Sequence, residues 1–306
     1  MINIWLAQNS GFCFGVKRAI RLAEETAKKY GNAMTIGPII HNPQVVEKLS
    51  NAGVKTIEDL NNITDQPVII RSHGIPIQTI KLLNKKKCTI IDATCPFVEK
   101  AHQFAKIADK EKYQIIILGN PKHPEIIALK SYVKANVIIC ENANSLPDTR
   151  YPKIAIICQT TQNINTLKKL TNKIIKNTNE LRIFNTICDA TNIRQHATLQ
   201  LAKKCDIMIV IGGKNSSNTK MLAKLSKKVT KTIHIEKADE LNIENLKQNI
   251  NIGLTAGAST PDWIILDVYN KIKQIVDPGK SNAQKVEDIP GYMEETNAKK
   301  NSKHTQ

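Results

Sequence analysis

The 306-residue chain has few aromatic residues, no long apolar run and no closely spaced pair of cysteines. Aromatic residues make up only 4% of the chain, and no basic stretch is interleaved with them, so the stacking faces of a single-stranded nucleic-acid binder are missing. No apolar run approaches the roughly 18 residues that span a bilayer, and no basic region precedes an apolar segment at the N-terminus. We therefore expect a cytoplasmic protein that binds neither nucleic acid nor a membrane.

Acidic residues are also scarce, since 27 Asp and Glu residues stand against 44 Lys and Arg residues, for a formal net charge of +17. This excess is compatible with an anionic partner such as a phosphorylated small molecule, although drift in composition toward Lys would produce it as well. The seven cysteines include no C-x-x-C pair, so a local zinc or ferredoxin motif is excluded. Because the cytosol keeps thiols reduced, we expect no disulfides.

Short β-branched runs alternate with amphipathic segments along the chain. This alternation is typical of βαβ units, in which helices connect parallel strands. In the segment 16–30, for example, Val16 and several alanines fall on one helical face, and Gly31 provides the stop. We expect strands over residues 2–6, 33–36, 67–70, 89–91, 115–118, 137–140, 154–158, 207–211, 232–235 and 252–254.

Three cysteines share one setting, because each follows an extended run and precedes an amphipathic segment. They are Cys13, Cys95 and Cys188, and the residues 28 positions later are His41, His123 and Ser216, each at the start of a further helix. This common spacing indicates an internal repeat of about 90 residues. We expect three α/β modules with small parallel sheets over residues 1–95, 96–188 and 189–277, followed by a polar C-terminal tail over residues 278–306.

Each expected module also holds two polar turns between a strand and a helix. In open α/β sheets these turns are where ligands bind, and the helix N-termini favour an anion. Taken singly, each turn could be no more than a helix cap. Three histidines fall in the turns beside the cysteines, so we favour a binding site for a small phosphorylated molecule. The turns cover residues 41–43, 72–74, 123–125, 159–161, 215–218 and 256–262.

A three-fold repeat that closes into a ring brings equivalent residues together on its axis. Three thiolates at one point repel one another, so Cys13, Cys95 and Cys188 would need a cation or a metal cluster between them. Zinc with three thiolates and a water is one solution. We favour an iron–sulfur cluster held by three cysteines, because it leaves one iron open for a substrate. We expect the remaining four cysteines to be structural, and these are Cys88, Cys140, Cys158 and Cys205.

Glu125 has no acidic counterpart in the other two modules, where Pro43 and Asn218 occupy the corresponding positions. A lone carboxylate in the first turn of a helix that faces a cavity could transfer protons. It could equally be a charge that stabilises the helix dipole. The residues alone leave both interpretations open.

Eight motifs, in chain order, resemble those of the 4-hydroxy-3-methylbut-2-enyl diphosphate reductase family. The similarity extends from about residue 3 to residue 275, and the tail from residue 278 lies outside it. The motifs are Gly-Phe-Cys-Phe-Gly-Val from residue 11, His41-Asn42-Pro43, Ser72-His73-Gly74, Asp92-Ala93-Thr94-Cys95-Pro96, Gly119 with His123-Pro124-Glu125, Gln159-Thr160-Thr161, Lys214-Asn215-Ser216-Ser217-Asn218 and Thr255-Ala256-Gly257-Ala258-Ser259.

The resemblance implies a trefoil of the three modules around one [4Fe-4S] cluster per chain, held by Cys13, Cys95 and Cys188 with one iron open. It implies Glu125 as the proton source, working with Thr160 at the hydroxyl end of the substrate. The residues that it assigns to substrate binding are His41, His73, His123, Thr160, Ser216, Ser217, Asn218 and Ser259.

The activity implied by the resemblance is reductive dehydroxylation of (E)-4-hydroxy-3-methylbut-2-enyl diphosphate to isopentenyl and dimethylallyl diphosphate, the last step of the non-mevalonate isoprenoid pathway. The electrons would come from a ferredoxin or flavodoxin, and part of the positive charge would serve docking of such an acidic protein. The alternative is a non-redox 4Fe-4S hydro-lyase that acts on a phosphorylated small molecule, which would need no reductant.

Overall fold

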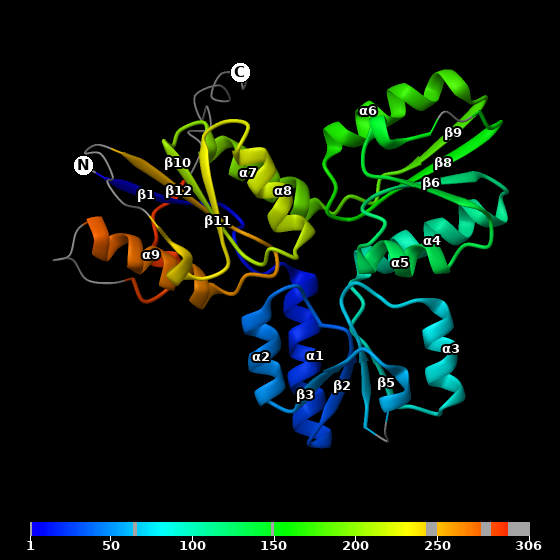
Figure 1. The fold of residues 1–306 in the computed structure, drawn as a ribbon, viewed down its shortest axis with the longest axis horizontal. Coiled ribbons are helices and arrows are strands. Elements are labelled where there is room, and N and C mark those ends of the chain that lie inside the picture. The colour runs from blue at the N-terminus through cyan, green and yellow to red at the C-terminus, as the bar shows by residue number, and fades with distance from the viewer. Residues whose placement is uncertain (1, 64–65, 148–149, 243–249, 277–282, 293–306) are drawn as a thin grey trace, which may run out of the picture. The chain divides into compact units, whose positions relative to one another are not determined.

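The computed structural model describes residues 2–63, 66–147, 150–242, 250–276 and 283–292 (Figure 1). The chain divides into two units. The first unit combines Met1–Gly11 with Ile193–Gln306, and the second unit is Phe12–Asn192. The described strands form three sheets, and their pairings are parallel. The α/β class with small parallel sheets is therefore confirmed.

The first sheet of the second unit has the strand order β3-β2-β4-β5. Helices α1 and α2 cover one face, where Ala23 and Val45 pack with Ile69, and α3 covers the other face through Leu83 (Figure 1). The elements are α1 (Phe14–Tyr30), β2 (Ala33–Ile36), α2 (Pro43–Asn51), β3 (Val54–Ile57), the 3-10 turn η1 (Leu60–Asn62), β4 (Val68–Ile70), α3 (Ile77–Lys85) and β5 (Ile90–Asp92).

The second sheet of this unit has the equivalent order β7-β6-β8-β9. Helices α4 and α5 pack on one face through Ala105 and Leu129, whereas α6 packs on the other through Leu170. The elements are α4 (Pro96–Lys110), β6 (Gln114–Leu118), α5 (Pro124–Ser131), β7 (Val137–Cys140), η2 (Ala143–Ser145), β8 (Lys153–Cys158), α6 (Ile164–Ile174), η3 (Ile175–Asn177) and β9 (Glu180–Phe184).

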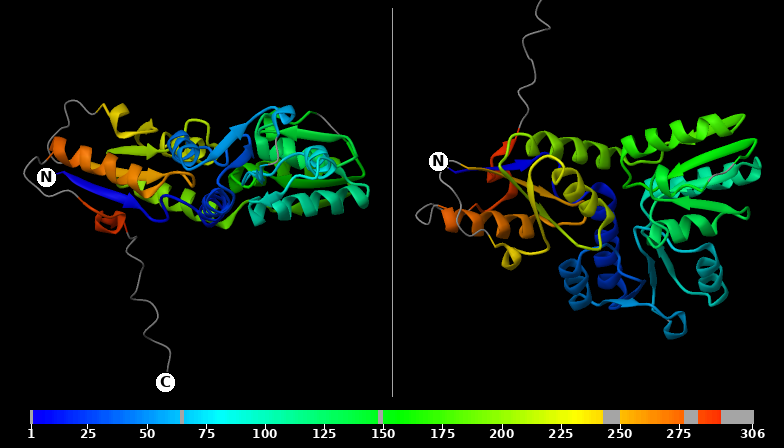
Figure 2. Two further views of the ribbon diagram at one scale, coloured as in Figure 1. Left: turned by 90° about the horizontal axis from the view of Figure 1, so that it is seen from below. Right: turned by 45° about the horizontal axis from the view of Figure 1, so that its top comes forward.

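The sheet of the first unit has the order β11-β10-β12-β1-β13. Helix α9 lies beside β1, as both views of Figure 2 show, because Ile265 and Val268 pack against Leu6 in one core. The elements are β1 (Asn3–Ala7), α7 (Asp189–Ala202, within which the two units meet in sequence), β10 (Ile207–Ile211), α8 (Ser217–Ser226), β11 (Lys231–Ile235), η4 (Ala238–Glu240), β12 (Asn251–Ala256), α9 (Asp262–Val276), η5 (Val286–Asp288) and β13 (Gly291–Tyr292).

Two of the expected module boundaries differ from the sheets that form. The N-terminal strand was expected in the module 1–95, but β1 pairs with β12, with Asn3 opposite Asn251. The expected tail 278–306 contributes β13, which pairs with β1, and Ile289, whose side chain is 4% exposed in the core beneath. The physical reason is that strands pair through backbone hydrogen bonds at a free sheet edge, whatever their distance in the sequence. Strand β1 pairs at the free edge of β12, and β13 then pairs with β1.

With β1 counted as a fourth strand, the three sheets repeat one order of strands. The fourth strands are β1, β5 and β9, and each leads within a few residues to one of the three cysteines, Cys13, Cys95 and Cys188. The repeat expected from the cysteine spacing is thus present in the architecture. Among the residues that the structure describes, no helix is long and apolar enough to cross a bilayer.

Candidate active site

The three repeat cysteines all stand where a helix begins. Cys13 is the N-cap of α1, Cys95 is the N-cap of α4, and Cys188 directly precedes α7. The carbonyl of each accepts the first helical hydrogen bonds, for example from the N–H of Lys17 to Cys13 and from the N–H of Thr191 to Cys188. Unpaired N–H groups and the positive end of the helix dipole gather at a helix start, so each cysteine stands where donors are available to a negatively charged group.

These cysteines also lie near one another within the second unit. Burial raises the pKa of the Cys95 thiol to about 11, the N–H of Phe97 lowers it in part, and negative charges on Cys13 and Cys188 raise it further. Burial likewise raises the pKa of Cys188, to which a charge on Cys13 adds. Three thiolates in mutual repulsion are stabilised by a cationic centre, so this donor set fits a thiolate-bound cluster.

Gly15, in the first turn of α1, leaves room for the sulfur of Cys95. A Cβ atom placed on Gly15 would lie 2.6 Å from the Sγ of Cys95 and 4.0 Å from the Sγ of Cys13. Any larger residue would therefore push into the space between two of the three thiols. The close approach of α1 to Cys95 depends on this glycine.

The other four cysteines belong to the cores of the sheets, as expected. Cys140 and Cys158 are buried around Leu118, Cys205 is buried beside α7, and Cys88 is partly buried behind β4. Burial raises the pKa of Cys140 to about 11 and the pKa of Cys158 and Cys205 to about 12. Because these thiols lie among apolar side chains of the sheet cores, they behave as small apolar side chains.

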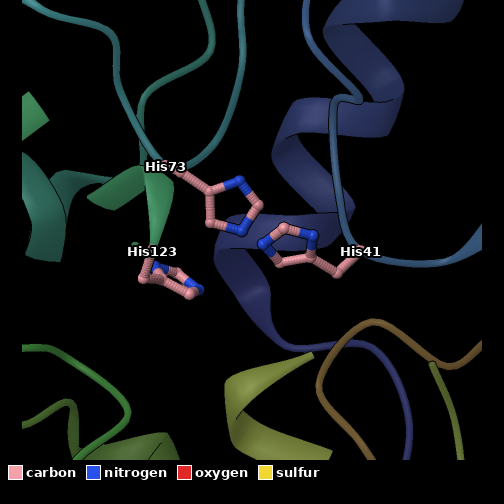
Figure 3. A group of neighbouring side chains, drawn as sticks. All are labelled: His41, His73 and His123. Atoms are coloured by element: carbon pink, nitrogen blue, oxygen red, sulfur yellow. The ribbon is translucent and has the colours of Figure 1, made fainter. Parts of the chain in front are cut away.

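Three histidines from separate turns of the second unit form one cluster. Figure 3 shows the rings of His41, His73 and His123 together. The ring centroids are 4.3 Å apart for His41 and His73, 5.2 Å for His41 and His123, and 5.5 Å for His73 and His123. One ring nitrogen from each lies within 4.8 Å of the others. The structure therefore brings together the three histidines that the sequence placed beside the cysteines.

Local hydrogen bonds hold each of these histidines in its turn. Asn42 caps α2 by accepting from the N–H of Val45 at 3.0 Å, which fixes His41 directly before the helix. The Ser72 hydroxyl donates to the Ile39 carbonyl at 2.9 Å, and this bond joins the turn of His73 to the turn of His41. His123 is itself the N-cap of α5.

The cluster offers a hydrogen-bond donor to a ligand. The Nδ1 atom of His123 accepts from the N–H of Glu125 at 3.2 Å, so the neutral ring carries its proton on Nε2 as a donor. Burial, then the neighbouring His41 and His123, and then Arg71 hold the pKa of His73 well below its usual value. Three imidazoles at this spacing could also ligate a metal ion. The adjacent N-termini of α2 and α5 favour phosphoryl oxygens.

Glu125 and Thr160 form a buried pair. Glu125 is 2% exposed, and its two carboxylate oxygens accept from the Thr160 N–H at 2.7 Å and from the Thr160 hydroxyl at 2.8 Å. Burial raises the pKa of Glu125 to about 7, although both bonds from Thr160 lower it. The Thr160 carbonyl accepts from the N–H of Cys188 at 2.9 Å, so the acid is connected to the turn of that cysteine.

The polar turns of the first unit hold the remaining residues assigned from the sequence. Ser216 is the N-cap of α8 and accepts from the N–H of Thr219 at 3.3 Å. Asn218 is 3% exposed, and among the described residues neither its Oδ1 nor its Nδ2 atom has a hydrogen-bond partner. Ser259 is 6% exposed and Ser217 is partly exposed. An amide that is buried without partners costs free energy unless a ligand satisfies it.

Two polar side chains of the second unit were given no role from the sequence, although Gln159 lies in the predicted turn 159–161. Gln159 is 2% exposed, its Oε1 atom accepts from the Asn120 N–H at 3.0 Å, and its Nε2 atom has no partner among the residues described. Arg71 lies beside the His73 turn. Its position directly before Ser72-His73-Gly74 could have indicated a role in the site. The direction in which its side chain points cannot be read from the sequence.

Comparison with known proteins assigns the family. The model of the LytB protein family matches residues 4–273. A protein of Geobacter metallireducens named 4-hydroxy-3-methylbut-2-enyl diphosphate reductase is 43% identical over 278 residues, which are 90% of this chain and 98% of that protein. A protein of Aquifex aeolicus with the same name is 42% identical over 281 residues, 90% of this chain and 97% of its own length. The chain belongs to the LytB family of reductases.

Solved structures agree with this LytB assignment. One described as the diphosphate reductase that terminates the non-mevalonate pathway has 41% sequence identity and a TM-score of 0.66, and covers 90% of this chain and 100% of its own. The reductase of Plasmodium falciparum has 31% identity and a TM-score of 0.83, and covers 95% of this chain and 91% of its own. The family resemblance and the reductase class are therefore confirmed, whereas nothing in these relatives supports a hydro-lyase.

Proposed function

We propose that this LytB chain reductively removes the hydroxyl group of (E)-4-hydroxy-3-methylbut-2-enyl diphosphate to give isopentenyl and dimethylallyl diphosphate, the last step of the non-mevalonate isoprenoid pathway. The reaction takes up two electrons and two protons, breaks the allylic C–O bond and releases water. The observation that supports it best is the placement of Cys13, Cys95 and Cys188 at three helix starts of one unit, where charges on the thiols influence one another, in a chain whose relatives carry this name.

The same three cysteines would hold one [4Fe-4S] cluster per chain and leave one iron open. The thiols are free, partly buried and electrostatically coupled, and Gly15 leaves room between two of them. When bound, the cluster supplies the electrons and a Lewis-acidic iron for the hydroxyl end of the substrate. The chain's own contribution would be the three sulfur atoms and the N–H groups at the helix starts, of which the N–H of Phe97 offsets part of the effect of burial on Cys95.

The diphosphate would be bound by the histidine cluster and by the polar turns. Ring donors beside two helix N-termini come from His41, His73 and His123. The Thr160 hydroxyl would lie near the hydroxyl group of the substrate. The buried amide of Asn218 supports the assignment for the first unit. The full set is His41, His73, His123, Thr160, Ser216, Ser217, Asn218 and Ser259.

Glu125 would give the proton that leaves with the hydroxyl group. With a pKa near 7, its carboxyl is protonated in a sizeable fraction of molecules at neutral pH, as a general acid requires. The Thr160 hydroxyl, 2.8 Å from one carboxylate oxygen, holds the acid in place and can pass on a proton. Thr160 is therefore the second catalytic residue of the proposal.

An acidic one-electron carrier of the ferredoxin or flavodoxin type would supply the electrons. The formal charge of +17 favours encounter with such a protein. We propose a cytoplasmic location for the chain, as expected from the sequence.

Anaerobic turnover with and without a chemical one-electron reductant tests the reaction class. We expect both isoprenoid diphosphates to form only with reductant, at two electrons per product, because C–O cleavage with replacement by hydrogen is a net reduction. The products are measured by mass spectrometry. Conversion of the substrate without reductant would contradict the reductase and would indicate the hydro-lyase alternative.

Asn218→Ala should weaken substrate binding by roughly ten- to a hundredfold, since hydrogen bonds to a charged group contribute about 1.5–3 kcal/mol each. The dissociation constant is measured by titration of the anaerobic protein, whose cluster spectrum should not change. Ser226→Ala is the matched control, because this serine lies at the other end of α8 and its buried hydroxyl also has no partner in the described part of the chain. Equal affinities of the two variants for substrate would show that the Asn218 turn only caps helix α8 and does not bind the substrate.

A further inference from the structure

Arg71 lies between the two turns that carry His41 and His73. It follows β4 directly, and its Nε–H donates to the carbonyl of Gly74, on the far side of His73, at 3.3 Å. Its guanidinium also covers Gly37, where the chain leaves β2 for the His41 turn. A Cβ atom on Gly37 would lie 2.5 Å from Nη1 and 3.3 Å from Cζ of Arg71. A single side chain therefore contacts both turns.

Gly37 is required for this arrangement for two reasons. Its φ angle is +69°, a conformation that favours glycine, and the guanidinium fills the space where a side chain would stand. The Gly37 N–H donates to the Ile57 carbonyl at 2.8 Å, which ties the turn to the end of β3. The arginine therefore packs on a fixed backbone surface.

The charge of Arg71 has no acidic partner among the described residues. Its Nε–H donates to a neutral carbonyl, and no carboxylate of the described segments lies within ion-pair distance. The side chain is partly buried, yet a guanidinium keeps its proton in proteins. Its positive charge is felt by His73. A cation without a counter-ion among the described residues thus lies close enough to His73 to affect its pKa.

A diphosphate needs more than neutral donors. Burial holds the pKa of His73 well below its usual value, so this ring offers an N–H group but no charge at neutral pH. Burying a multiply charged anion without compensation is costly. A guanidinium compensates charge and does not depend on pH in the physiological range. Arg71 is placed to do this while it also fixes the geometry of both turns.

We propose that Arg71 is a positioning residue of the diphosphate site, which holds the His41 and His73 turns in place and provides positive charge for the phosphoryl oxygens. The inference rests on the proposed function, because it takes the histidine cluster to be where the diphosphate binds.

The test compares Arg71→Met, Arg71→Lys and Arg182→Met in the anaerobic, cluster-loaded enzyme. Arg182→Met is the matched control, since it removes the same charge from β9, where Arg182 pairs with Glu111 at the exposed edge of the other sheet. The measured quantities are KM, kcat, the inhibition constant of inorganic diphosphate, the cluster spectrum and the melting temperature.

Arg71→Met should raise KM and the inhibition constant of inorganic diphosphate by roughly ten- to a hundredfold, while kcat changes less than about threefold. Arg71→Lys should recover at least about half of that loss on a logarithmic scale, because it keeps the charge and loses only the planar donor set. Arg182→Met should match the wild type, and the cluster spectrum should be the same throughout.

His73→Ala separates failure of this inference from failure of the proposed function. If His73→Ala weakens diphosphate binding but Arg71→Met does not, the role of Arg71 is wrong and the site stands. If neither variant weakens it, the histidine cluster is not the diphosphate site and both proposals fail. Equal losses in Arg71→Lys and Arg71→Met, together with lowered melting temperatures, would show a purely structural arginine and overturn the inference.

Discussion

Glu125→Gln should turn over at least about a hundredfold more slowly than the wild type, since a positioned acid contributes about 10²- to 10⁴-fold in rate. The substitution keeps the shape of the side chain, and its amide oxygen can still accept from the Thr160 N–H while its NH2 group donates to the Thr160 hydroxyl oxygen, but the amide cannot give a proton to the substrate. We expect the cluster spectrum and substrate affinity to be retained. Anaerobic kinetics beside a spectroscopic titration with substrate separate a chemical defect from a binding defect.

The pH dependence of kcat/KM tests the role of Glu125 in a second way. Burial raises the pKa of Glu125 to about 7, so the acid form is complete at lower pH and is lost as the pH rises through 7. The wild-type kcat/KM should therefore fall on the alkaline side with an apparent pKa near 7. The Glu125→Gln variant should lack this fall.

Glu99→Gln is the control for a charge that only stabilises a helix dipole. Glu99 also lies in the first turn of a helix, α4, but it is exposed. We expect its replacement to leave turnover within about threefold of the wild type. Near-normal turnover of Glu125→Gln would remove this residue from the proton path, and His123, Thr160 or the substrate's own diphosphate would be the remaining candidates.

Cys188→Ser should lose the cluster, or hold it only in labile form, and turnover should fall below detection. The same result is expected for Cys13→Ser and Cys95→Ser, because the three thiols are the proposed cysteine ligands and a serine hydroxyl is a poor replacement for a thiolate. Cys88→Ser and Cys140→Ser are the matched controls from the sheet cores and should keep both cluster and activity. A full cluster in Cys188→Ser would contradict the repeat on which the assignment is based.

The sequence predicts the buried strands well and the edges of the sheets poorly. All ten expected strands form within one or two residues of their predicted limits. The strands that were not predicted as such, β3, β9 and β13, lie at sheet edges, where side chains are largely exposed and the apolar signal is weak. Strand β1 pairs with β12 although Asn3 and Asn251 lie almost at opposite ends of the chain, and no local sequence pattern predicts such a pairing.

The residues of the candidate site also differ in how well the sequence predicts them. Residues that occupy equivalent places in the repeat, such as Cys95 and His123, could be found by spacing, because the repeat sets strand ends and helix starts at fixed positions. The pairing of Glu125 with Thr160 brings together residues 35 positions apart. The packing of Arg71 on Gly37 joins two turns through the direction of one side chain. Only the folded structure shows these last two contacts.

The most direct test of the account is the iron and acid-labile sulfide content of the anaerobically purified wild-type chain, recorded with its absorption spectrum. We predict four irons and four sulfides per chain and a broad visible absorption that bleaches with reductant, as expected for a cluster held by Cys13, Cys95 and Cys188. A colourless protein that contains one zinc per chain, or no metal, and that gains no cluster after reconstitution with iron and sulfide would contradict it.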